Sequence, residues 1–253
     1  MKITTWNVNG LRAALGKGFS GWLQAEQPDV LCLQEIKAKP EQLSDDQKTF
    51  PGYEVVWNPA DRPGYSGVAT FLHGTEMEAE RGLGEPKFDV EGRVIRTRHD
   101  HFLLYNIYFP NGQRGQDRVD YKLEFYSHLL NICDKLHSKD ENIIITGDFN
   151  TAHKPIDLKN SKENEKTSGF LPEERVWIDH YLDHGFVDIF RHLYPDKVQY
   201  TWWTYITNAR ARNVGWRLDY FLISKKLISH VKDVIIRDDV MGSDHCPVTL
   251  IID

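Results

Sequence analysis

The stretch Ile143-Ile144-Ile145-Thr146-Gly147-Asp148-Phe149-Asn150 joins an apolar, β-branched run to a polar turn. A run of isoleucines is typical of a β-strand. Asp148 and Asn150 follow where that strand ends, and both residue types are also common in ordinary turns. The stretch therefore predicts a strand that ends either in a plain turn or in a functional site.

Short apolar strands that end in polar residues recur on both sides of this stretch. Their β-branched and aromatic content, with Gly, Pro or Asn at the ends, supports the interpretation. We expect strands at residues 2–7, 29–35, 53–58, 66–72, 93–98, 102–109, 142–148, 218–224, 232–237 and 247–252.

Helices are fewer than strands. The patterns predict one helix at residues 10–27, which stops at Pro28, and another at residues 172–184. The clearest is expected at residues 117–137, where apolar side chains recur every three or four residues. Its stripe consists of Val119, Leu123, Tyr126, Leu130 and Cys133.

Nothing in the sequence divides the chain into parts. We find no Ser/Gly-rich or Pro-rich linker and no internal repeat. The most polar segment, residues 154–168, is expected to be a surface loop. Ten strands with a few helices between them predict an α/β fold, with two packed sheets and helices outside. We expect one domain that covers residues 1–253.

Composition excludes several classes of protein. The 253 residues include 31 Lys and Arg against 37 Asp and Glu, so 31 − 37 gives a net charge of −6. That balance excludes a histone-like protein but not an enzyme with a local basic face. No apolar run approaches the roughly 20 residues of a membrane span, and residues 1–7 predict a strand and not the apolar region of a signal peptide. We expect a soluble, intracellular protein.

Several expected strands end by presenting carboxylates, amides or a histidine. Glu35 follows the run 30–33, and Asn7 and Asn9 follow the first strand. Alone, Glu35 is better explained as a solvated strand end, and Asn7 and Asn9 are equally well explained as a turn or a helix start. Together with Asp148, Asn150, Asp219, Asp244 and His245, they are a large set of polar residues at strand ends.

The segment Ser243-Asp244-His245-Cys246 precedes the last strand. We do not expect a serine triad, because neighbours in sequence rarely align into a hydrogen-bonded relay. Cys246 is better explained as a buried thiol than as a nucleophile. His245 would suit phosphate binding if a carboxylate such as Asp219 oriented it and favoured its cationic form.

The types of candidate ligand limit the chemistry. The three cysteines, Cys32, Cys133 and Cys246, are far apart, which disfavours a disulfide framework and a zinc cluster. A site rich in oxygen ligands suits Mg²⁺ or Mn²⁺. Such a site fits phosphodiester hydrolysis, in which a carboxylate orients water. No P-loop pattern is present.

Residues 197–218 contain basic and aromatic side chains and no acid. Such a mixture can grip a nucleic-acid backbone and enclose an extruded nucleotide. The alternative is a set of core rings with a solvated basic loop, and we expect some of the rings to be core. The basic and aromatic members are Lys197, Tyr200, Trp202, Trp203, Tyr205, Arg210, Arg212, Trp216 and Arg217.

Eight motifs in one order are similar to those of a known family. They include Trp6-Asn7-Val8-Asn9-Gly10-Leu11-Arg12-Ala13, Leu31-Cys32-Leu33-Gln34-Glu35, Gly64-Tyr65-Ser66-Gly67-Val68, Tyr108-Phe109-Pro110-Asn111 and Gly147-Asp148-Phe149-Asn150. The others are Gly169-Phe170-Leu171-Pro172-Glu173-Glu174-Arg175, Asn213-Val214-Gly215-Trp216-Arg217-Leu218-Asp219-Tyr220 and Ser243-Asp244-His245. The chain resembles the exonuclease III family of apurinic/apyrimidinic endonucleases over essentially its whole length.

The resemblance implies a four-layer α/β sandwich, with two mixed β-sheets packed face to face. It also implies a Mg²⁺-dependent enzyme of DNA base-excision repair that cuts duplex DNA 5′ to an abasic site, leaving a 3′-hydroxyl and a 5′-deoxyribose phosphate. By position, Glu35 would be the main metal ligand, with Asn7 beside it and Asp244 near the metal or His245. Asp148 would deprotonate the attacking water.

The remaining roles carried over by resemblance concern the phosphate and the DNA. Asn150 would hold the water and the phosphate, His245 supported by Asp219 would contact the scissile phosphate, and Tyr108 would lie near it. The residues matched to DNA contacts are Arg12, Asn111, Arg114, Asn164, Trp202, Trp216 and Arg217. Trp202 and Trp216 would wall the pocket that takes the flipped abasic sugar.

Three positions depart from the pattern of some relatives. Thr167 stands where Asn often contacts the site, and Trp202 where Phe is common, so strictness for abasic sites over uracil or oxidised bases stays open. Thr4 replaces a redox-associated Cys of animal enzymes, so a redox signalling role is unsupported. Exonuclease, 3′-phosphatase and 3′-phosphodiesterase side activities also stay open.

Two alternatives remain beside this hypothesis. A phospholipid or inositol phosphate hydrolase would share the Asn, Glu and Ser-Asp-His elements but would not carry residues 213–217. A non-catalytic binder of damaged DNA would have lost metal or base residues, which are all present here. We expect a monomer that acts in the cytoplasm, at the nucleoid of a prokaryote.

Overall fold

The computed structural model describes residues 1–74 and 77–253, and in them the strands form two six-stranded sheets. Sheet A consists of β1 (Lys2–Asn7), β2 (Val30–Gln34), β3 (Tyr53–Asn58), β4 (Val68–His73), β11 (Val231–Ile236) and β12 (Val248–Ile252). Sheet B consists of β5 (Ala79–Arg81), β6 (Val94–Arg98), β7 (Leu103–Tyr108), β8 (Ile143–Asp148), β9 (Phe186–Asp188) and β10 (Asp219–Ser224).

Both sheets are mixed. Their strand orders are β11-β12-β1-β2-β4-β3 and β5-β6-β7-β8-β10-β9. The pairs β1–β2 and β7–β8 are parallel, and the other pairs are antiparallel. Nine of the ten predicted strands begin and end within one residue of a strand seen here; the tenth, predicted from Ser66, begins at Val68 and ends at His73. The sequence missed β5 and β9, which have only three residues each.

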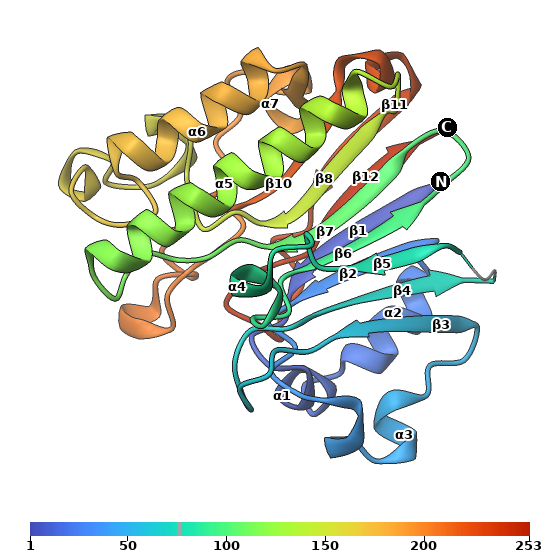
Figure 1. The fold of residues 1–253 in the computed structure, drawn as a ribbon. Helices are drawn as coiled ribbons and strands as arrows, with labels where there is room; N and C mark the ends of the chain where they lie inside the picture. Colours follow the sequence, from blue (N-terminus) through green and yellow to red (C-terminus); the bar gives the residue numbers. More distant parts are fainter. Residues whose placement is uncertain (75–76) are drawn as a thin grey trace.

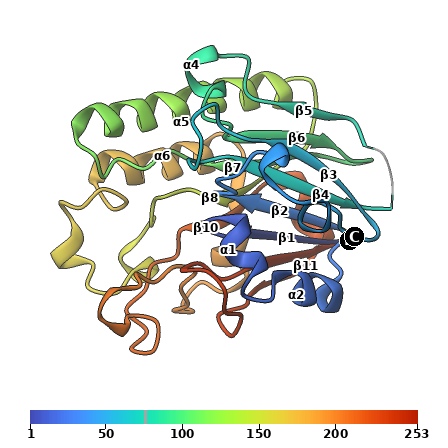
Figure 2. The ribbon, with the colours of Figure 1, turned by 90° about the horizontal axis from the view of Figure 1, so that it is seen from below.

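Helices cover the outer face of each sheet (Figure 1). On sheet B lie α5 (Gln116–His137) and α6 (Pro172–Asp183), whose apolar faces share one core with the sheet. On sheet A lie α1 (Leu11–Leu15), α2 (Phe19–Glu26) and α3 (Asp45–Lys48), and Figure 2 shows α1 and α2 in front of it. Two further short helices are α4 (Pro86–Asp89) and α7 (Ile189–Leu193).

The core between the sheets completes four layers. Ile3 and Val30 from sheet A meet Leu104 and Ile144 from sheet B in one buried cluster. Apolar burial of this kind stabilises the sandwich by about 25 cal/mol per Å². The order helix, sheet, sheet, helix confirms the predicted fold class.

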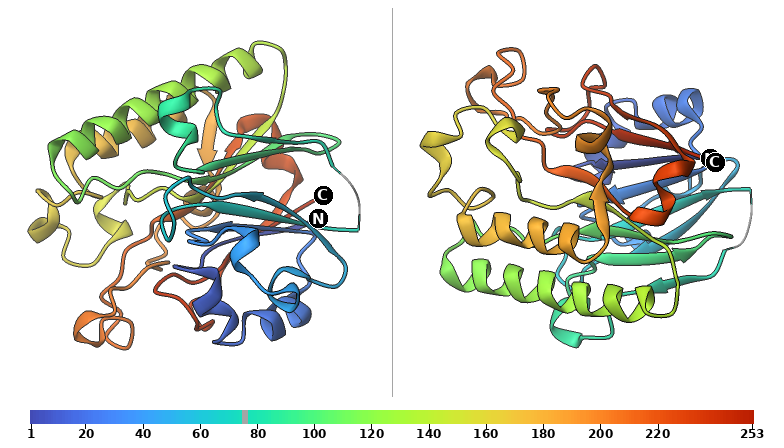
Figure 3. Two further views of the ribbon diagram at one scale, coloured as in Figure 1. Left: turned by 60° about the horizontal axis from the view of Figure 1, so that its bottom comes forward. Right: turned by 90° about the horizontal axis from the view of Figure 1, so that it is seen from above.

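The two ends of the chain lie side by side in sheet A (Figure 3). β1 pairs with β12, and the Met1 ammonium donates to the carbonyl of Ile252 at 2.5 Å. The pairing brings the segment before β12 to the end of β1, where Ser243 Oγ donates to the carbonyl of Asn7 at 2.8 Å. The first motif of the sequence, residues 6–13, and the last, residues 243–245, are therefore neighbours in the structure.

Two helix predictions needed correction. The helix predicted at 10–27 is split into α1 and α2, because Gly18 adopts a left-handed conformation with φ 94° between them. In α5 the predicted stripe is confirmed at four of its five residues; Leu123 is only half-buried, whereas Lys122 and Phe125, outside the predicted stripe, are buried. In the predicted loop 154–168, Leu158 is buried rather than solvated.

Among the residues that the structure describes, no helix has both the length and the apolar character needed to cross a membrane.

Candidate active site

The polar strand ends meet at one edge of the sandwich. β1 ends at Asn7 and β8 at Asp148, on facing sheets. Within sheet B, Asp148 lies opposite Tyr108 of β7 on one side and Asp219 of β10 on the other. Sheet register and sheet packing therefore bring together residues that are far apart in sequence.

Asn7 links the carboxylates of the two sheets. Its Nδ2 donates to Glu35 Oε1 at 3.0 Å and to Asp148 Oδ2 at 2.9 Å. Glu35 and Asn150 both adopt left-handed backbone conformations with φ 50°, which cost non-glycine residues free energy and are common at functional sites. The backbone N–H of Asn150 donates to Asp148 Oδ1 at 2.8 Å, so both oxygens of the Asp148 carboxylate accept a hydrogen bond and are held in place.

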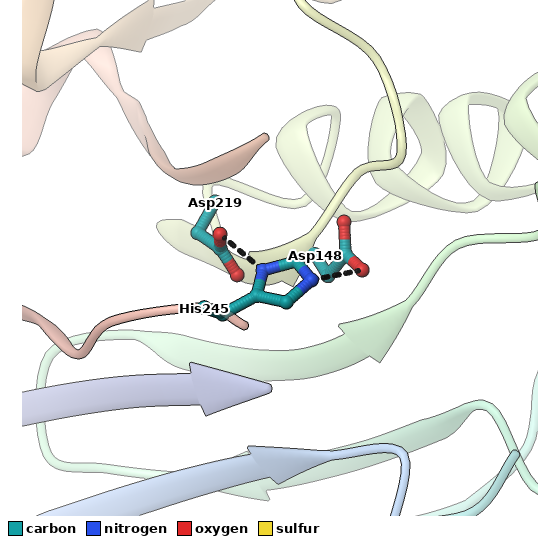
Figure 4. A group of neighbouring side chains, drawn as sticks. All are labelled: Asp148, Asp219 and His245. Atoms are coloured by element: carbon teal, nitrogen blue, oxygen red, sulfur yellow. Dashed lines mark hydrogen bonds and ion pairs between the residues drawn. The ribbon is translucent and has the colours of Figure 1, made fainter. Parts of the chain in front are cut away.

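His245 lies between two buried carboxylates (Figure 4). Its Nδ1 is 2.8 Å from Asp219 Oδ2, and its Nε2 is 3.7 Å from Asp148 Oδ2. Burial disfavours a charged imidazole, but the charges of Asp219 and Asp148 outweigh burial and raise the pKa of His245 to about 10. Burial raises the pKa of Asp148, and the positive charge of His245 opposes that shift. The two carboxylates therefore favour the imidazolium form of His245, whose Nε2 faces Asp148 and not its Asp219 partner.

The group Asp148, Asp219 and His245 is compact enough to suggest a metal site, since a ligand atom of each lies within 4.8 Å of the others. However, an imidazolium has no lone pair for a metal, and here it already supplies the positive charge. A better place for a cation is Glu35, whose Oε2 is paired with the Lys37 ammonium at 2.8 Å. The Glu35 carboxylate offers hard oxygen ligands of the kind that Mg²⁺ prefers, and Asn7 Nδ2 holds it beside Asp148.

A cavity of about 460 Å³ opens over these groups. Glu35, Asp148 and His245 line it. The rest of its lining combines apolar and polar side chains. The apolar ones are Trp202, Val214, Trp216 and Leu218, and the polar ones include Asn111, Asn150, Asn164 and Thr167.

The two tryptophans form a corner of the cavity. Trp202 and Trp216 pack edge to face, with ring centroids 6.2 Å apart. Trp202 Nε1 donates to Asp244 Oδ2 at 3.1 Å, and Asn9 donates to Asp244 Oδ1 at 3.0 Å. Burial alone would raise the pKa of Asp244, but the His245 charge and these donors lower it. Asp244 thus lines the cavity as an anion that holds Trp202.

Tyr108 and Arg114 line a second cavity beside the first, whereas Arg12 lies outside both. Tyr108 is buried, and burial together with the nearby Glu35 charge raises the pKa of its hydroxyl well above the usual value. Asn111 lines both the first cavity and the second one of about 330 Å³, which Arg114 also lines. Arg12 is exposed on α1 and lines neither cavity.

The prediction that Arg217 contacts DNA is wrong. Only 1% of its surface is exposed, and its guanidinium is paired with Asp157 at 2.9 Å and with Asp188 at 2.7 Å. Arg210 is also structural, because it donates to three main-chain carbonyls. The acidic partners of Arg217, in the acid-free stretch 197–218, come from other parts of the chain, namely Asp157 and Asp188. The local sequence of the stretch could not indicate them.

Arg217→Met should lower the free energy of unfolding by about 3–5 kcal/mol, because Asp188 would stay buried without its ionic partner and Asp157 would keep only Arg191. The Arg217 charge lowers the pKa of Asp157 to about 2 despite burial. This stabilisation is therefore present above the unfolded pKa near 4 and is lost as the pH falls toward 2. Urea unfolding at pH 7 measures the effect. Arg212→Met, at an exposed arginine, should change it by less than about 0.5 kcal/mol.

Some residues at the site were missed by sequence reasoning. Lys37 binds Glu35 and also Asn9, and its place two residues after Glu35 was the only local signal. Thr204, which lines the cavity, was also missed. The buried thiol predicted at Cys246 is confirmed, since burial raises its pKa far above the range of a reactive thiol.

Comparison with known proteins identifies the family of the chain. Residues 4–245 match the model of the Endonuclease/Exonuclease/phosphatase family. The chain is 44% identical to an exodeoxyribonuclease of Bacillus subtilis, over 100% of this chain and 99% of that protein. It is also 44% identical to the DNA repair nuclease APEX1 of Danio rerio, over 100% of this chain and 82% of that protein.

Solved structures show the same architecture. An AP endonuclease from Leishmania major superposes with a TM-score of 0.88 at 35% identity, over 98% of this chain and 86% of the other. A 3′-5′ exonuclease from Neisseria meningitidis gives 0.91 at 29% identity, over the whole of both chains. The chain belongs to the endonuclease/exonuclease/phosphatase family. The resemblance drawn from the eight motifs is thereby confirmed.

Proposed function

We propose that this chain hydrolyses the phosphodiester 5′ to an abasic site in duplex DNA with Mg²⁺ as its cofactor, Mn²⁺ being the alternative. The products would be a 3′-hydroxyl and a 5′-deoxyribose phosphate. Its full-length relatives make it a DNA-repair nuclease, and the choice of abasic sites is the part that we propose. The observation that carries the choice is the cavity in which the two tryptophans stand beside Asp148 and His245.

The walls of this cavity suit a sugar without its base. Trp202, Trp216 and Leu218 offer apolar surface, and the Trp202 indole N–H already binds Asp244. A base would bring its polar edges against the apolar surface of Trp202 and Leu218, which is unfavourable. An abasic nucleotide is also the easiest to extrude, because no base has to be unstacked.

The hydrolysis follows from the orientation of three side chains. Asp148 would accept a proton from the attacking water, which Asn150 would help to hold. His245 would donate from Nε2 to a non-bridging oxygen of the scissile phosphate, because its Nδ1 is engaged by Asp219. Asn7 keeps Asp148 and Glu35 in place. Glu35 would hold the cation, with Asn7 beside it and Asp244 on the same cavity, and the charge of the cation would stabilise the phosphate and make the water more acidic.

The test is single-turnover cleavage of a labelled duplex with one abasic-site analogue, in Mg²⁺ and in EDTA. Intact, uracil-containing and 3′-recessed duplexes run in parallel. Rapid nicking 5′ to the analogue in Mg²⁺ alone would support the proposal. Faster cutting of the uracil-containing duplex than of the abasic duplex would mean that uracil, and not the abasic site, is the preferred lesion. Tight binding of the abasic duplex without any cleavage would contradict the proposed hydrolysis.

A second candidate activity is removal of nucleotides or phosphate from 3′ ends. The likeness to the Bacillus exodeoxyribonuclease and to the Neisseria 3′-5′ exonuclease favours it. We propose it as a side activity of the same site, since the same attack on a phosphorus atom would serve both. If the 3′-recessed duplex were degraded faster than the abasic duplex is nicked, processing of 3′ ends would be the main activity and cleavage at abasic sites the side activity.

We also propose that the protein acts as a monomer inside the cell, as would suit an enzyme whose substrate is chromosomal DNA. Sedimentation of the protein alone and with one abasic duplex would reveal a dimer if this part of the proposal is wrong.

Binding should weaken steeply with salt, because phosphate contacts release counterions. Arg114→Ala should reduce the slope of log K against log salt concentration by about one. Arg98 is a matched control, since it lies at the end of β6 opposite Leu103, whereas Arg114 lines a cavity beside Tyr108. Titration of a fluorescent duplex in EDTA measures both slopes, and a flat response would contradict a groove that contacts phosphates.

A further inference from the structure

The turn that carries Asp148 and Asn150 is held from behind by α5. Lys122 Nζ donates to the main-chain carbonyl of Asn150 at 2.7 Å. The Tyr126 hydroxyl donates to the preceding carbonyl, that of Phe149, at 2.8 Å. Lys122 and Tyr126 are four residues apart, so they lie on the same face of the helix, one turn from each other. One helix thus fixes two successive carbonyls of the turn.

Lys122 is an unusual residue for this place. It is fully buried, and burial lowers its pKa, whereas the charge of Glu174 opposes that shift. Glu174 Oε1 receives the ammonium at 2.8 Å and is itself fully buried. An apolar side chain could occupy this position without the desolvation of two charges. What the ammonium adds is a directed, charge-assisted hydrogen bond to the carbonyl of Asn150.

The ion pair also reaches the wall of the cavity. Glu174 accepts hydrogen bonds from Ser168 Oγ at 2.9 Å and from the amides of Gly169 at 2.5 Å and Leu171 at 3.1 Å. Ser168 and Gly169 line the cavity. The pair therefore connects the catalytic turn to the loop that encloses the substrate.

The turn needs such support because its backbone is strained. Asn150 has φ 50°, a left-handed conformation that costs a non-glycine residue free energy, although asparagine tolerates it better than most. Its side-chain Nδ2 donates to the carbonyl of Phe109 at 2.9 Å, and the side chain and the backbone together set the position of the amide at the cavity. Release of the Asn150 carbonyl would let the peptide rotate and strain the bond to Phe109, so the amide would shift.

We propose that Lys122 and Tyr126 are positioning residues of the nuclease, which hold Asn150 in its working geometry without touching the DNA. The inference rests on the proposed function, because it takes Asn150 as the residue that holds water and phosphate. Glu174 has the supporting role of neutralising Lys122 and tying the arrangement to residues 168–171.

The test compares the chemical step with binding. Lys122→Met should lower the single-turnover rate at saturating abasic duplex by about 10- to 100-fold, the loss expected of a small misplacement of a reacting group. The Kd for the same duplex in EDTA should change by less than about threefold, since no DNA contact is removed. In an Asn150→Ala background, Lys122→Met should change the rate by less than about threefold, because the residue through which it acts is already gone.

Two tyrosines provide a matched pair that does not depend on the folding of the lysine variant. Tyr126→Phe removes the hydroxyl that binds the Phe149 carbonyl and should slow cleavage. Tyr181→Phe removes a buried hydroxyl that binds the carbonyl of Tyr126 at 2.8 Å, a contact with α5 and not with the turn, and should leave the rate unchanged.

Three results would overturn the proposal. One is cleavage by Lys122→Met and Tyr126→Phe within about twofold of the parent rate. Another is that Lys122→Met lowers the cleavage rate by the same factor in the parent and in the Asn150→Ala background. The third is that Tyr126→Phe and Tyr181→Phe lower the cleavage rate equally. Failure of the proposed function would look different, since the parent protein itself would not nick the abasic duplex. The same comparison would then be made on the DNA that the parent cuts fastest.

Discussion

Asp148→Asn is expected to lower the single-turnover rate of cleavage by about 10²- to 10⁴-fold, the usual contribution of a general base. An amide of the same shape cannot take a proton from water. The fold should change little, because the removal of a buried charge whose pKa burial raises opposes the loss of one of the hydrogen bonds from Asn7 and Asn150. We therefore expect an unfolding midpoint close to that of the parent, with the activity lost.

Asp179→Asn is the matched control for this variant. Asp179 is also paired with a histidine, His153, at 2.8 Å, but 54% of its side chain is exposed and it lies on α6. Its replacement should change the rate by less than about twofold. Cleavage by Asp148→Asn at the parent rate would refute the assignment of Asp148 as the base, whatever the state of the control.

His245→Gln is expected to lower the same rate by about 10²- to 10³-fold, as does the loss of one donor to a developing negative charge. Two effects act together. The imidazolium that would meet the phosphate is removed, and the carboxylates of Asp148 and Asp219 are left facing each other without a cation between them. The second effect favours a protonated Asp148, which cannot act as a base.

His99 offers a control with the same residue type. It is buried at the far end of β6, and burial lowers its pKa to about 4, so it is neutral at pH 7. His99→Gln should alter stability but not the rate per folded molecule. A loss of activity in His99→Gln as large as in His245→Gln would mean that the measurement reports folding and not chemistry.

The strands were predictable because their signal is local. Side chains such as Ile143–Ile145 must be buried, and β-branched residues favour extended backbone. Short elements carry too little of that signal, and β9, of three residues, is stabilised mainly by pairing with β10. A glycine break such as Gly18 interrupts a helix at a point that periodicity alone does not mark.

The candidate site was predictable in its members but not in its arrangement. Resemblance of whole motifs indicated Glu35, Asp148 and His245 as partners, and the structure places them around one cavity. The same resemblance assigned Arg217 to DNA, because a motif does not tell whether an arginine faces solvent or a buried carboxylate. Lys122 was overlooked for the opposite reason, since a lysine on a helix is ordinarily exposed.

The sequence by itself determined the chemical types available at the site and the strand ends that carry them, because turn residues after apolar runs are set by local order. Only the tertiary structure decided which groups meet. The pairing of β10 with β8 places Asp219 opposite Asp148, and the pairing of β12 with β1 brings His245 to the same edge. Those contacts join residues that are 71 and more than 200 positions apart, and their partners are chosen by sheet register and core packing, which no local pattern encodes.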